Sequence, residues 1–327
     1  NIRDAILSLY NSLTPDHKNL LSMSETLKKL TTDTQISVVE NSLLNNYIGP
    51  SSNVLNSPTG IETQTWMANQ LKGLMPDECR FAVTGPAQSG KSTVLSMGVS
   101  LFYQKLQLTG ESQNYLLFPF NWRLQQICLD DVSKLYSLFI TTTLKMLRNS
   151  RMELITIILP LKQWFLSLIT QQVLPPLPPQ IVHYTTFPHD AVTEIGRSIH
   201  TKWSNRDGFR EFLREVVNFP SFMAKAFGFV SAVYIFDHFD NCGYEISPTE
   251  HFQSENMLNG STPVVLSELV CEAIEKTPFF VASQNDIDFF NLFSVEEYHQ
   301  LSTEKIIQLP QEAGSQSPSR SPSQLKT

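Results

Sequence analysis

Short apolar runs and longer amphipathic segments alternate along most of this chain. Four runs have the length and the aromatic and β-branched content of buried strands: RFAVT (80–84), NYLLFPFNW (114–122), AVYIFD (232–237) and PFFVAS (278–283). Apolar residues at helical spacing lie between them, as in KSTVLSMGVSLFYQKL (91–106) and VVLSELVCEAIEK (264–276). Apolar strands that alternate with helices predict an α/β fold, with a parallel sheet covered by helices on both faces.

Changes in pattern along the chain also predict its domain boundaries. Residues 1–46 have helical spacing and are expected to form a helical N-terminal segment, whereas 47–60 are rich in Gly, Pro, Ser and Asn and are typical of a linker. The α/β domain is then expected over 61–310, with a long helical insertion at about 125–228. Residues 311–327 lack core-forming side chains and are expected to be a disordered tail.

The loop after the first strand carries candidate chemistry. It reads Gly85-Pro86-Ala87-Gln88-Ser89-Gly90-Lys91-Ser92, followed by Thr93, and fits the phosphate-loop pattern G-x-x-x-x-G-K-[ST]. Glycines let successive backbone N–H groups point inward, and the helix that follows adds its positive N-terminal end. We therefore expect Lys91 to contact the β and γ phosphates of a nucleotide, Ser92 to bind Mg²⁺ and Thr93 to lie near the α phosphate.

With a buried strand before the loop and an apolar helix after it, the chain resembles the P-loop NTPases. Asp237 ends the apolar run 233–236, which is similar to the Walker B motif of that class. The resemblance implies ATP and Mg²⁺ as ligands, with Ser92 and Asp237 on the metal. An acid that only caps the turn after its strand is the simpler alternative for Asp237.

Two comparisons favour one branch of that class. Asp237 comes much later in the chain than the corresponding acid of small GTPases. DNCG (240–243) fits the GTPase pattern Asp-x-x-Gly, but the guanine-reading Asn-Lys-x-Asp is missing, since SQND (283–286) lacks the lysine. The remaining resemblance is to the ASCE branch, which has an additional strand between the two motifs and includes the AAA+ and STAND (NACHT-like) ATPases.

The residues after Asp237 bear on hydrolysis. AAA+ proteins usually have Asp-Glu at this point, whereas this chain has Asp237-His238. The string IFDHFD (235–240) is similar to the STAND ATPases, in which a second acid follows three residues later, and this match implies Asp240 as the catalytic base. Because aspartate is one methylene shorter than glutamate, we expect hydrolysis to be slow.

The next strand and the insertion supply weaker candidates. FFVASQND (279–286) resembles the strand of this branch that ends in a γ-phosphate sensor, for which Gln284 and Asn285 are candidates, although STAND relatives often have arginine there. A polar strand end in solvent explains these two residues equally well. The insertion, which contains the stiff, polyproline-like PPLPP (175–179), could cap the nucleotide or bind a partner protein. Its arginines include candidates for an arginine finger, although a basic helical face is usually only solvated; they are Arg197, Arg206, Arg210 and Arg214.

Composition narrows the class of partner. A net charge of −7 without a Lys/Arg block argues against nucleic acid, and the most apolar segment, 152–170, is interrupted by Glu153, Pro160 and Lys162, which argues against a membrane span. The four cysteines are scattered, which is typical of reduced thiols in an intracellular protein, cytoplasmic or nuclear. Because residue 1 is Asn and no leader sequence follows it, we expect neighbouring domains of a longer chain, or a protein partner.

The sequence thus favours an ATP-binding switch module, in which nucleotide and Mg²⁺ order the loops around Asp237 and Gln284. A scaffold that binds nucleotide without hydrolysis is the second hypothesis, because the Asp-Glu pair and the arginine sensor are missing. A small-molecule kinase with the insertion as its lid is the third, but the arginines of the insertion are spread instead of grouped around one acceptor pocket.

Overall fold

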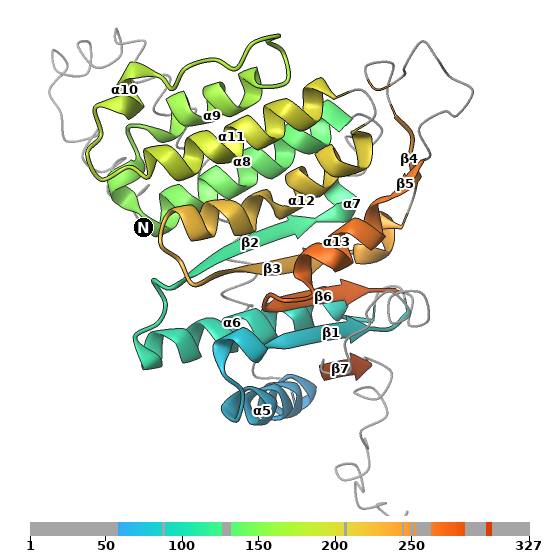
Figure 1. Ribbon diagram of the computed structural model, residues 1–327. Coiled ribbons are helices and arrows are strands. Elements are labelled where there is room, and N and C mark those ends of the chain that lie inside the picture. Colours follow the sequence, from blue (N-terminus) through green and yellow to red (C-terminus); the bar gives the residue numbers. More distant parts are fainter. Residues whose placement is uncertain are drawn as a thin grey trace, which may run out of the picture.

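The computed structural model places a parallel β-sheet at the centre of the protein (Figure 1). It describes residues 58–86, 89–125, 132–205, 208–243, 245–248, 252, 263–284 and 299–302. In spatial order the strands are β2 (Tyr115–Asn121), β3 (Ser231–Asp237), β6 (Phe279–Ser283), β1 (Arg80–Thr84) and β7 (His299–Ser302), and every neighbouring pair is parallel. β6 therefore lies between β1 and β3.

The carboxyl ends of these strands bring polar residues together at one edge of the sheet. The register places Asn121 of β2 beside Asp237 of β3, and Thr84 of β1 beside Ser283 of β6. Thr84, Asp237 and Ser283 are buried, although each follows an apolar run. Since buried polar groups must find hydrogen-bond partners, this edge is the part of the sheet where polar interactions concentrate.

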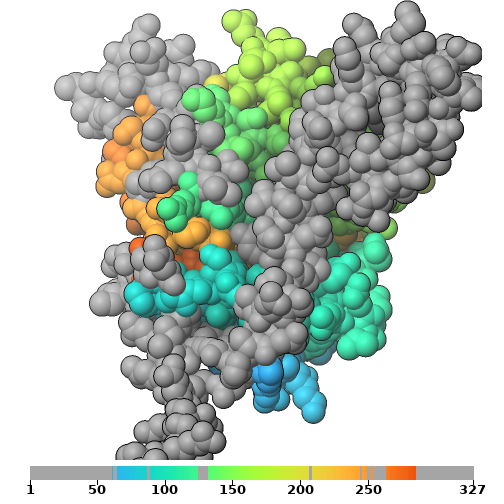
Figure 2. All heavy atoms as spheres, turned by 180° about the vertical axis from the view of Figure 1, so that it is seen from behind, coloured from blue at the N-terminus to red at the C-terminus, as the bar shows by residue number. Residues whose placement is uncertain are grey.

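Helices cover both faces of the sheet. On one face α6 (Lys91–Thr109) packs against β1, β3 and β6, with α5 (Pro58–Lys72) outside it, and the rings of Phe102 and Phe280 lie 5.3 Å apart. On the other face the Tyr234 hydroxyl of β3 donates to the carbonyl of Val217 in α12 (Phe209–Ala226) at 3.3 Å. Seen from behind, α5 and α6 (blue to cyan) lie below the green residues of the helices that follow β2 (Figure 2).

The chain between β2 and β3, over which a helical insertion at about 125–228 was predicted, forms a layer of helices beside β2. Its elements are α7 (Trp122–Gln125), α8 (Val132–Ser150), the 3₁₀ helix η3 (Met152–Leu154), α9 (Ile158–Ser167), α10 (Pro179–Val182), α11 (His189–Ser204) and α12. α12 joins this layer to the sheet, because it packs on α8 and α11 as well as on β2 and β3. Glycine at 196 lets α11 approach α9 closely, since a Cβ there would overlap the ring of Trp164.

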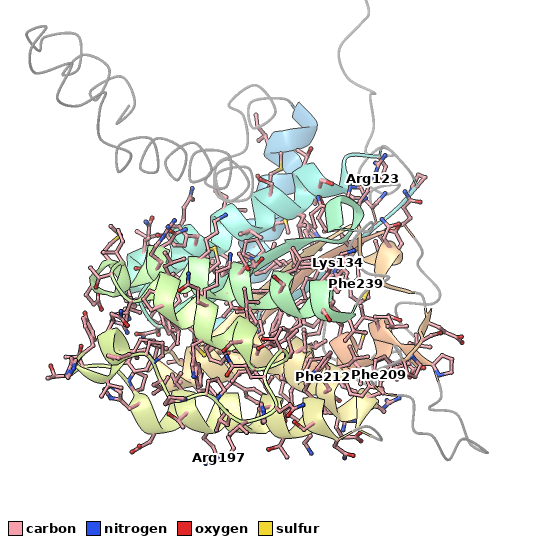
Figure 3. All side chains as sticks on the ribbon, turned by 90° about the horizontal axis from the view of Figure 1, so that it is seen from above. Arg123, Lys134, Arg197, Phe209, Phe212 and Phe239 are labelled. Atoms are coloured by element: carbon pink, nitrogen blue, oxygen red, sulfur yellow. The ribbon has the colours of Figure 1, made fainter. Side chains whose placement is uncertain are left out.

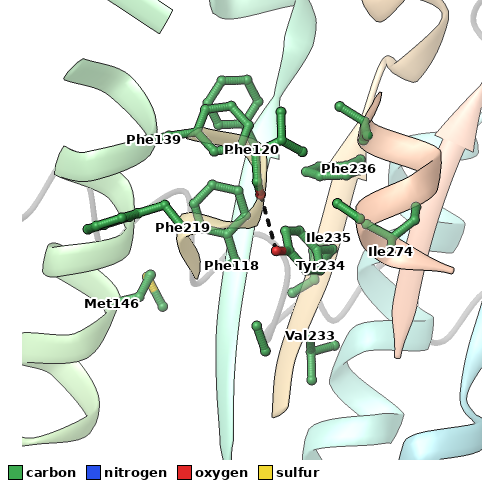
Figure 4. Packing of buried hydrophobic residues seen from close by; sticks show 14 of the residues in the cluster. Phe118, Phe120, Phe139, Met146, Phe219, Val233, Tyr234, Ile235, Phe236 and Ile274 are labelled. Carbon is green, nitrogen blue, oxygen red and sulfur yellow. Dashed lines mark hydrogen bonds between the residues drawn. The ribbon is translucent and has the colours of Figure 1, made fainter. Parts of the chain in front are cut away.

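The layer and the sheet share one aromatic core (Figure 4). The ring of Phe118 on β2 lies 5.2 Å from that of Phe139 on α8 and 5.6 Å from that of Tyr234 on β3. Phe236 continues the same core towards the carboxyl edge. Burying side chains of this size contributes about 1.5–3 kcal/mol each relative to leaving them exposed, so the insertion belongs to the stable part of the fold.

The predicted strands are present in the structure, whereas other elements differ from the prediction. All four predicted strands form within a residue or two of the expected ranges. α5 begins at Pro58, inside the segment predicted as a linker, because proline suits the first turn of a helix. β7 and the short antiparallel pair β4 (Glu245–Ile246) and β5 (Val264–Val265) were not predicted. The predicted helical segment 1–46, most of the linker and the tail 311–327 lie outside the described residues.

Candidate functional site

The glycine-rich loop lies between the carboxyl end of β1 and the start of α6. Gly85 (φ 148°) and Gly90 (φ 84°) have positive φ angles that favour glycine, and Gly90 is the residue from which α6 begins. Gly85 is buried and Gly90 is exposed. Ser89 donates its backbone N–H to the Pro86 carbonyl at 3.4 Å, which turns the loop back on itself. Ala87 and Gln88, both predicted to bind phosphate, lie outside the described residues.

The first turn of α6 carries the residues predicted to contact phosphate and metal. The first N–H groups of any helix have no carbonyl partner within that helix, so this end of α6 offers donors and a positive dipole end to an anion. Lys91, Ser92 and Thr93 follow Gly90 directly, and Thr93 is partly buried. The sequence therefore places the predicted ligands at the end of α6 that suits an anion.

Lys91 is a buried cation. Its side chain is 7% exposed, and its Nζ donates to the Pro86 carbonyl oxygen at 2.5 Å. Burial lowers the pKa of Lys91, and the carboxylates of Asp240 and Asp237 oppose that shift. The lysine thus lies over the loop with two acidic groups close enough to affect its charge, and an added anion would stabilise its protonated form further.

Ser92 and Asp237 meet across the gap between α6 and β3. The Ser92 hydroxyl donates to Asp237 Oδ1 at 3.0 Å, although the two residues lie 145 positions apart in the chain. Asp237 Oδ1 also accepts the backbone N–H of His238 at 2.9 Å, and the amide of Asn121 reaches Oδ2 at 3.5 Å. The carboxylate therefore faces the first turn of α6 from the end of β3, two strands away from β1.

A second polar link joins η4 (Phe239–Cys242) to the end of β6. Asp240 Oδ1 accepts the backbone N–H of Gln284 at 3.0 Å, so the predicted base and one predicted sensor residue are in direct contact. His238, between the two acids, has φ 54°, a left-handed conformation that is uncommon outside glycine and clusters at functional sites. Asn285, the other predicted sensor, lies outside the described residues.

The three described arginines that were candidates for an arginine finger all pair with glutamates on helices. Arg197 pairs with Glu194 on its own helix, and it lies on the outer side of the molecule, well away from Phe239 of η4 (Figure 3). Arg210 and Arg214 both reach Glu272 of α13 (Leu266–Ile274), each at 3.1 Å. Arg206 lies outside the described residues. The pairs of Arg210 and Arg214 tie α12 to α13, and none of these pairs directs a guanidinium towards the loop at 85–92.

Two residues that the sequence analysis did not select also lie at this edge. Asn121 ends β2 and contacts Asp237, and the exposed Arg123 is the second residue of α7, which packs on η4. Figure 3 shows Arg123 and Phe239 at the same end of the molecule. The sequence did hold a signal for Asn121, because this polar residue directly follows the apolar run YLLFPF (115–120), as Asp237 follows its own apolar run.

The oxygen atoms of Ser92 and Asp237 would suit a Mg²⁺ ion that also binds phosphate and water, and are too few for a metal ion held by protein side chains alone. Ser92 and Asp237 supply hard oxygen ligands, and among the described residues no group of three or more His, Cys, Asp and Glu could hold a metal ion. Mg²⁺ prefers oxygen and is commonly held by one or two protein side chains together with phosphates and water. Such an ion, once bound, would neutralise phosphate charge beside Lys91.

Comparisons with known proteins do not assign the chain to a family, so its function is argued from the geometry of the site. No protein-family model matches the chain, and a search of curated proteins found no significant match. None of the helices in the described part of the chain has the length and apolar character needed to cross a membrane.

Proposed function

We propose that this protein is an ATP-binding P-loop NTPase module that works as a slowly hydrolysing switch. The single observation that carries the proposal is the hydrogen bond from Ser92 Oγ to Asp237 Oδ1 at 3.0 Å. It joins the two sequence motifs in the way that a shared Mg²⁺ would require, with Ser92 and Asp237 as protein ligands of the ion. Lys91 and the first N–H groups of α6 would bind the phosphates.

The strand order supports the same branch of the class that the sequence favoured. β6 lies between β1, which leads into the glycine-rich loop, and β3, which ends in Asp237. An additional strand between the two motifs is the arrangement expected of the ASCE branch. Gln284 at the end of β6 lies next to Asp240, as expected of a residue that senses the γ phosphate from the intervening strand.

The contacts of Asp240 support slow turnover. One carboxylate oxygen already accepts the Gln284 N–H at 3.0 Å. A base must lie within hydrogen-bond reach of the water that it activates, and a carboxylate held by a neighbouring strand has less freedom to reach it. The same contact gives Asp240 a role in the switch, because a movement of its carboxylate would change the hydrogen bond to Gln284 and so the position of the chain directly after β6.

The non-hydrolysing scaffold is the second candidate, and the Asp240–Gln284 contact is the observation that favours it. If Asp240 only holds η4 to β6, bound nucleotide stabilises the fold without being turned over. Measuring phosphate release in parallel with nucleotide binding separates the two, because only the switch releases phosphate, and Asp240→Asn should abolish that release while nucleotide still binds.

The test of the proposal is the Mg²⁺ dependence of ATP binding, measured by calorimetry on the wild type and on Asp237→Asn. We expect Mg²⁺ to tighten ATP binding to the wild type by about tenfold or more, as one metal ligand of ordinary strength would. Asp237→Asn should bind ATP with the same affinity in the presence and absence of Mg²⁺. Asp240→Asn is the matched control and should keep the dependence. A dependence that Asp237→Asn retains in full would refute the assigned metal site.

A further inference from the structure

The coil between α9 and α10 carries a motif that the nucleotide site does not use. Together with the first residue of α10, its sequence is VLPPLPP (173–179), in which prolines recur at the spacing P-x-x-P twice, at 175 and 178 and at 176 and 179. Figure 1 shows this coil at the outer end of the helical layer, on the side away from the sheet. It is therefore separate from the edge of the sheet that carries Ser92 and Asp237.

The coil has the features of a polyproline II helix. Pro178 has φ −55° and ψ 141°, close to the polyproline II values of about −75° and +145°. Each proline fixes φ near −65°, and Leu174 and Leu177 stand before prolines, which keeps them extended as well. Consecutive prolines with this spacing favour a helix with three residues per turn.

Within 173–179 the exposure of the side chains repeats with the same period of three. Val173 is 77% exposed, and Pro176 and Pro179 are also exposed. The residues between them, at 174, 175, 177 and 178, are partly buried. Residues three apart share one edge of a polyproline II helix, so Val173 and Pro176 lie on the exposed edge, and Pro179, the first residue of α10, continues it. All three side chains are apolar.

Hydrogen bonds hold the coil on the helical layer. The indole Nε1 of Trp164 in α9 donates to the Pro175 carbonyl at 3.0 Å, and the Nε2 of His200 in α11 lies 3.2 Å from the Gln171 carbonyl. Trp164 is itself buried between α9 and α11. A ligand segment that is already held in its bound conformation loses little conformational entropy on binding, so the entropic cost of binding a partner should be low for this coil.

We propose that residues 173–179 are a docking ligand for a protein domain with an aromatic-lined, polyproline-binding groove, of the kind that WW and SH3 domains provide. The sequence holds no Lys, Arg, Asp or Glu between Lys162 and Asp190, so stacking of prolines on aromatic rings and hydrogen bonds to backbone carbonyls supply the contacts. Binding should therefore depend little on salt, because the segment itself has no charged side chain to pair with the partner.

The test titrates the full chain into isotope-labelled WW and SH3 domains from a panel and follows the resonances of their groove aromatics. We expect at least one domain to bind through its groove. Pro176→Ala and Pro179→Ala, each made separately, should weaken that binding by about tenfold or more, the cost of losing a central contact. Leu108→Ala is the control, because Leu108 is 90% exposed on α6 and lies outside the coil.

Four outcomes would overturn the proposal. They are that no domain of the panel binds, that both proline variants bind as tightly as the wild type, that binding maps outside the groove, or that the coil instead joins two copies of this chain. The last would appear in light scattering as a wild-type dimer that Pro176→Ala converts to a monomer. Pro176 lies outside every helix, so melting of this variant near the wild-type temperature will show that loss of binding is not loss of fold.

Discussion

Lys91 and Asp237 are charged side chains that the fold keeps almost entirely out of water. Lys91 is 7% exposed and Asp237 is 5% exposed, at the ends of α6 and β3. Burying a charge is costly unless a partner compensates it, and the lysine ammonium has a neutral carbonyl as its direct partner at 2.5 Å, with carboxylates further off. Such a site is more stable with an anion added to it, which is the property expected of a phosphate-binding lysine.

The burial of Lys91 should make the free energy of unfolding depend on pH in the alkaline range. Burial lowers its pKa below the ordinary value of 10.5, so folding disfavours the protonated form. The cost is fully present below the folded-state pKa and disappears as pH rises towards 10.5, because the unfolded chain then binds more protons than the folded one. We expect the free energy of unfolding of the wild type, measured by urea denaturation, to rise with pH relative to that of Lys91→Met.

Comparing the two proteins removes the contribution of every other titrating group, because both carry the same Tyr and Cys side chains. If the difference in unfolding free energy between wild type and Lys91→Met stays constant from neutral pH to pH 10.5, burial does not disfavour the protonated form of Lys91. Repeating the series with inorganic phosphate should reduce the difference, since an anion compensates the buried ammonium.

The junction of β1, the loop and α6 is the element on which the site depends. Gly90, at φ 84°, lets the chain turn from the loop into the helix, and a Cβ at this position would meet no atom within 4 Å. Any cost of a side chain at 90 is therefore a cost of backbone conformation and not of crowding. The turn at Gly90 sets the positions of Lys91 and Ser92, because they are the first two residues of α6.

Gly90→Ala should destabilise the protein by about 1–2 kcal/mol, the penalty for placing an L-residue in the left-handed region. Gly73→Ala is a matched control, because a Cβ at Gly73 also meets no atom within 4 Å and its φ is not in that region. At a compatible position, glycine to alanine is neutral or stabilising by up to about 1 kcal/mol. Chemical denaturation of both variants measures the two effects, and equal stabilities would show that Gly90 does not need its positive φ.

Individual elements show which parts of the fold the sequence predicts. β1, β3 and β6 could be predicted because each is an apolar run ended by a polar residue, and a buried parallel strand needs that pattern. β7 could not, because HQLS (299–302) is short and has only one apolar residue, and it becomes a strand only by pairing with β1. Local sequence therefore predicts strands that are buried on both faces and misses those that depend on a neighbour.

The same distinction applies to the site. The loop, Lys91, Ser92 and Asp237 follow from short local motifs, and the contact between Ser92 and Asp237 was the arrangement expected of them. Asn121 comes close to Asp237 only because β2 pairs with β3 in one register, which no local pattern reports. The engagement of Asp240 by the Gln284 N–H depends equally on β6 lying beside β3.

At the scale of the whole molecule, the site has a continuous route to the helical layer. Asp240 contacts the end of β6, α13 leads into β6, and Glu272 of α13 pairs with Arg210 and Arg214 of α12. α12 packs on α8 and α11 and leads into β3, which ends in Asp237. A change at the carboxyl edge could therefore bias the packing of α12 and α13, which is what a switch requires.

The central claim, that the loop at 85–92 binds nucleotide phosphate facing Asp237, is tested most directly by thermal melting with and without ATP and Mg²⁺. A ligand at about one hundred times its dissociation constant stabilises the folded state by about 2.7 kcal/mol, so the wild type should melt at a clearly higher temperature with the nucleotide. Lys91→Ala should lose most of this shift. A wild type whose melting does not respond to ATP, or a Lys91→Ala variant that keeps the full shift, would contradict the account.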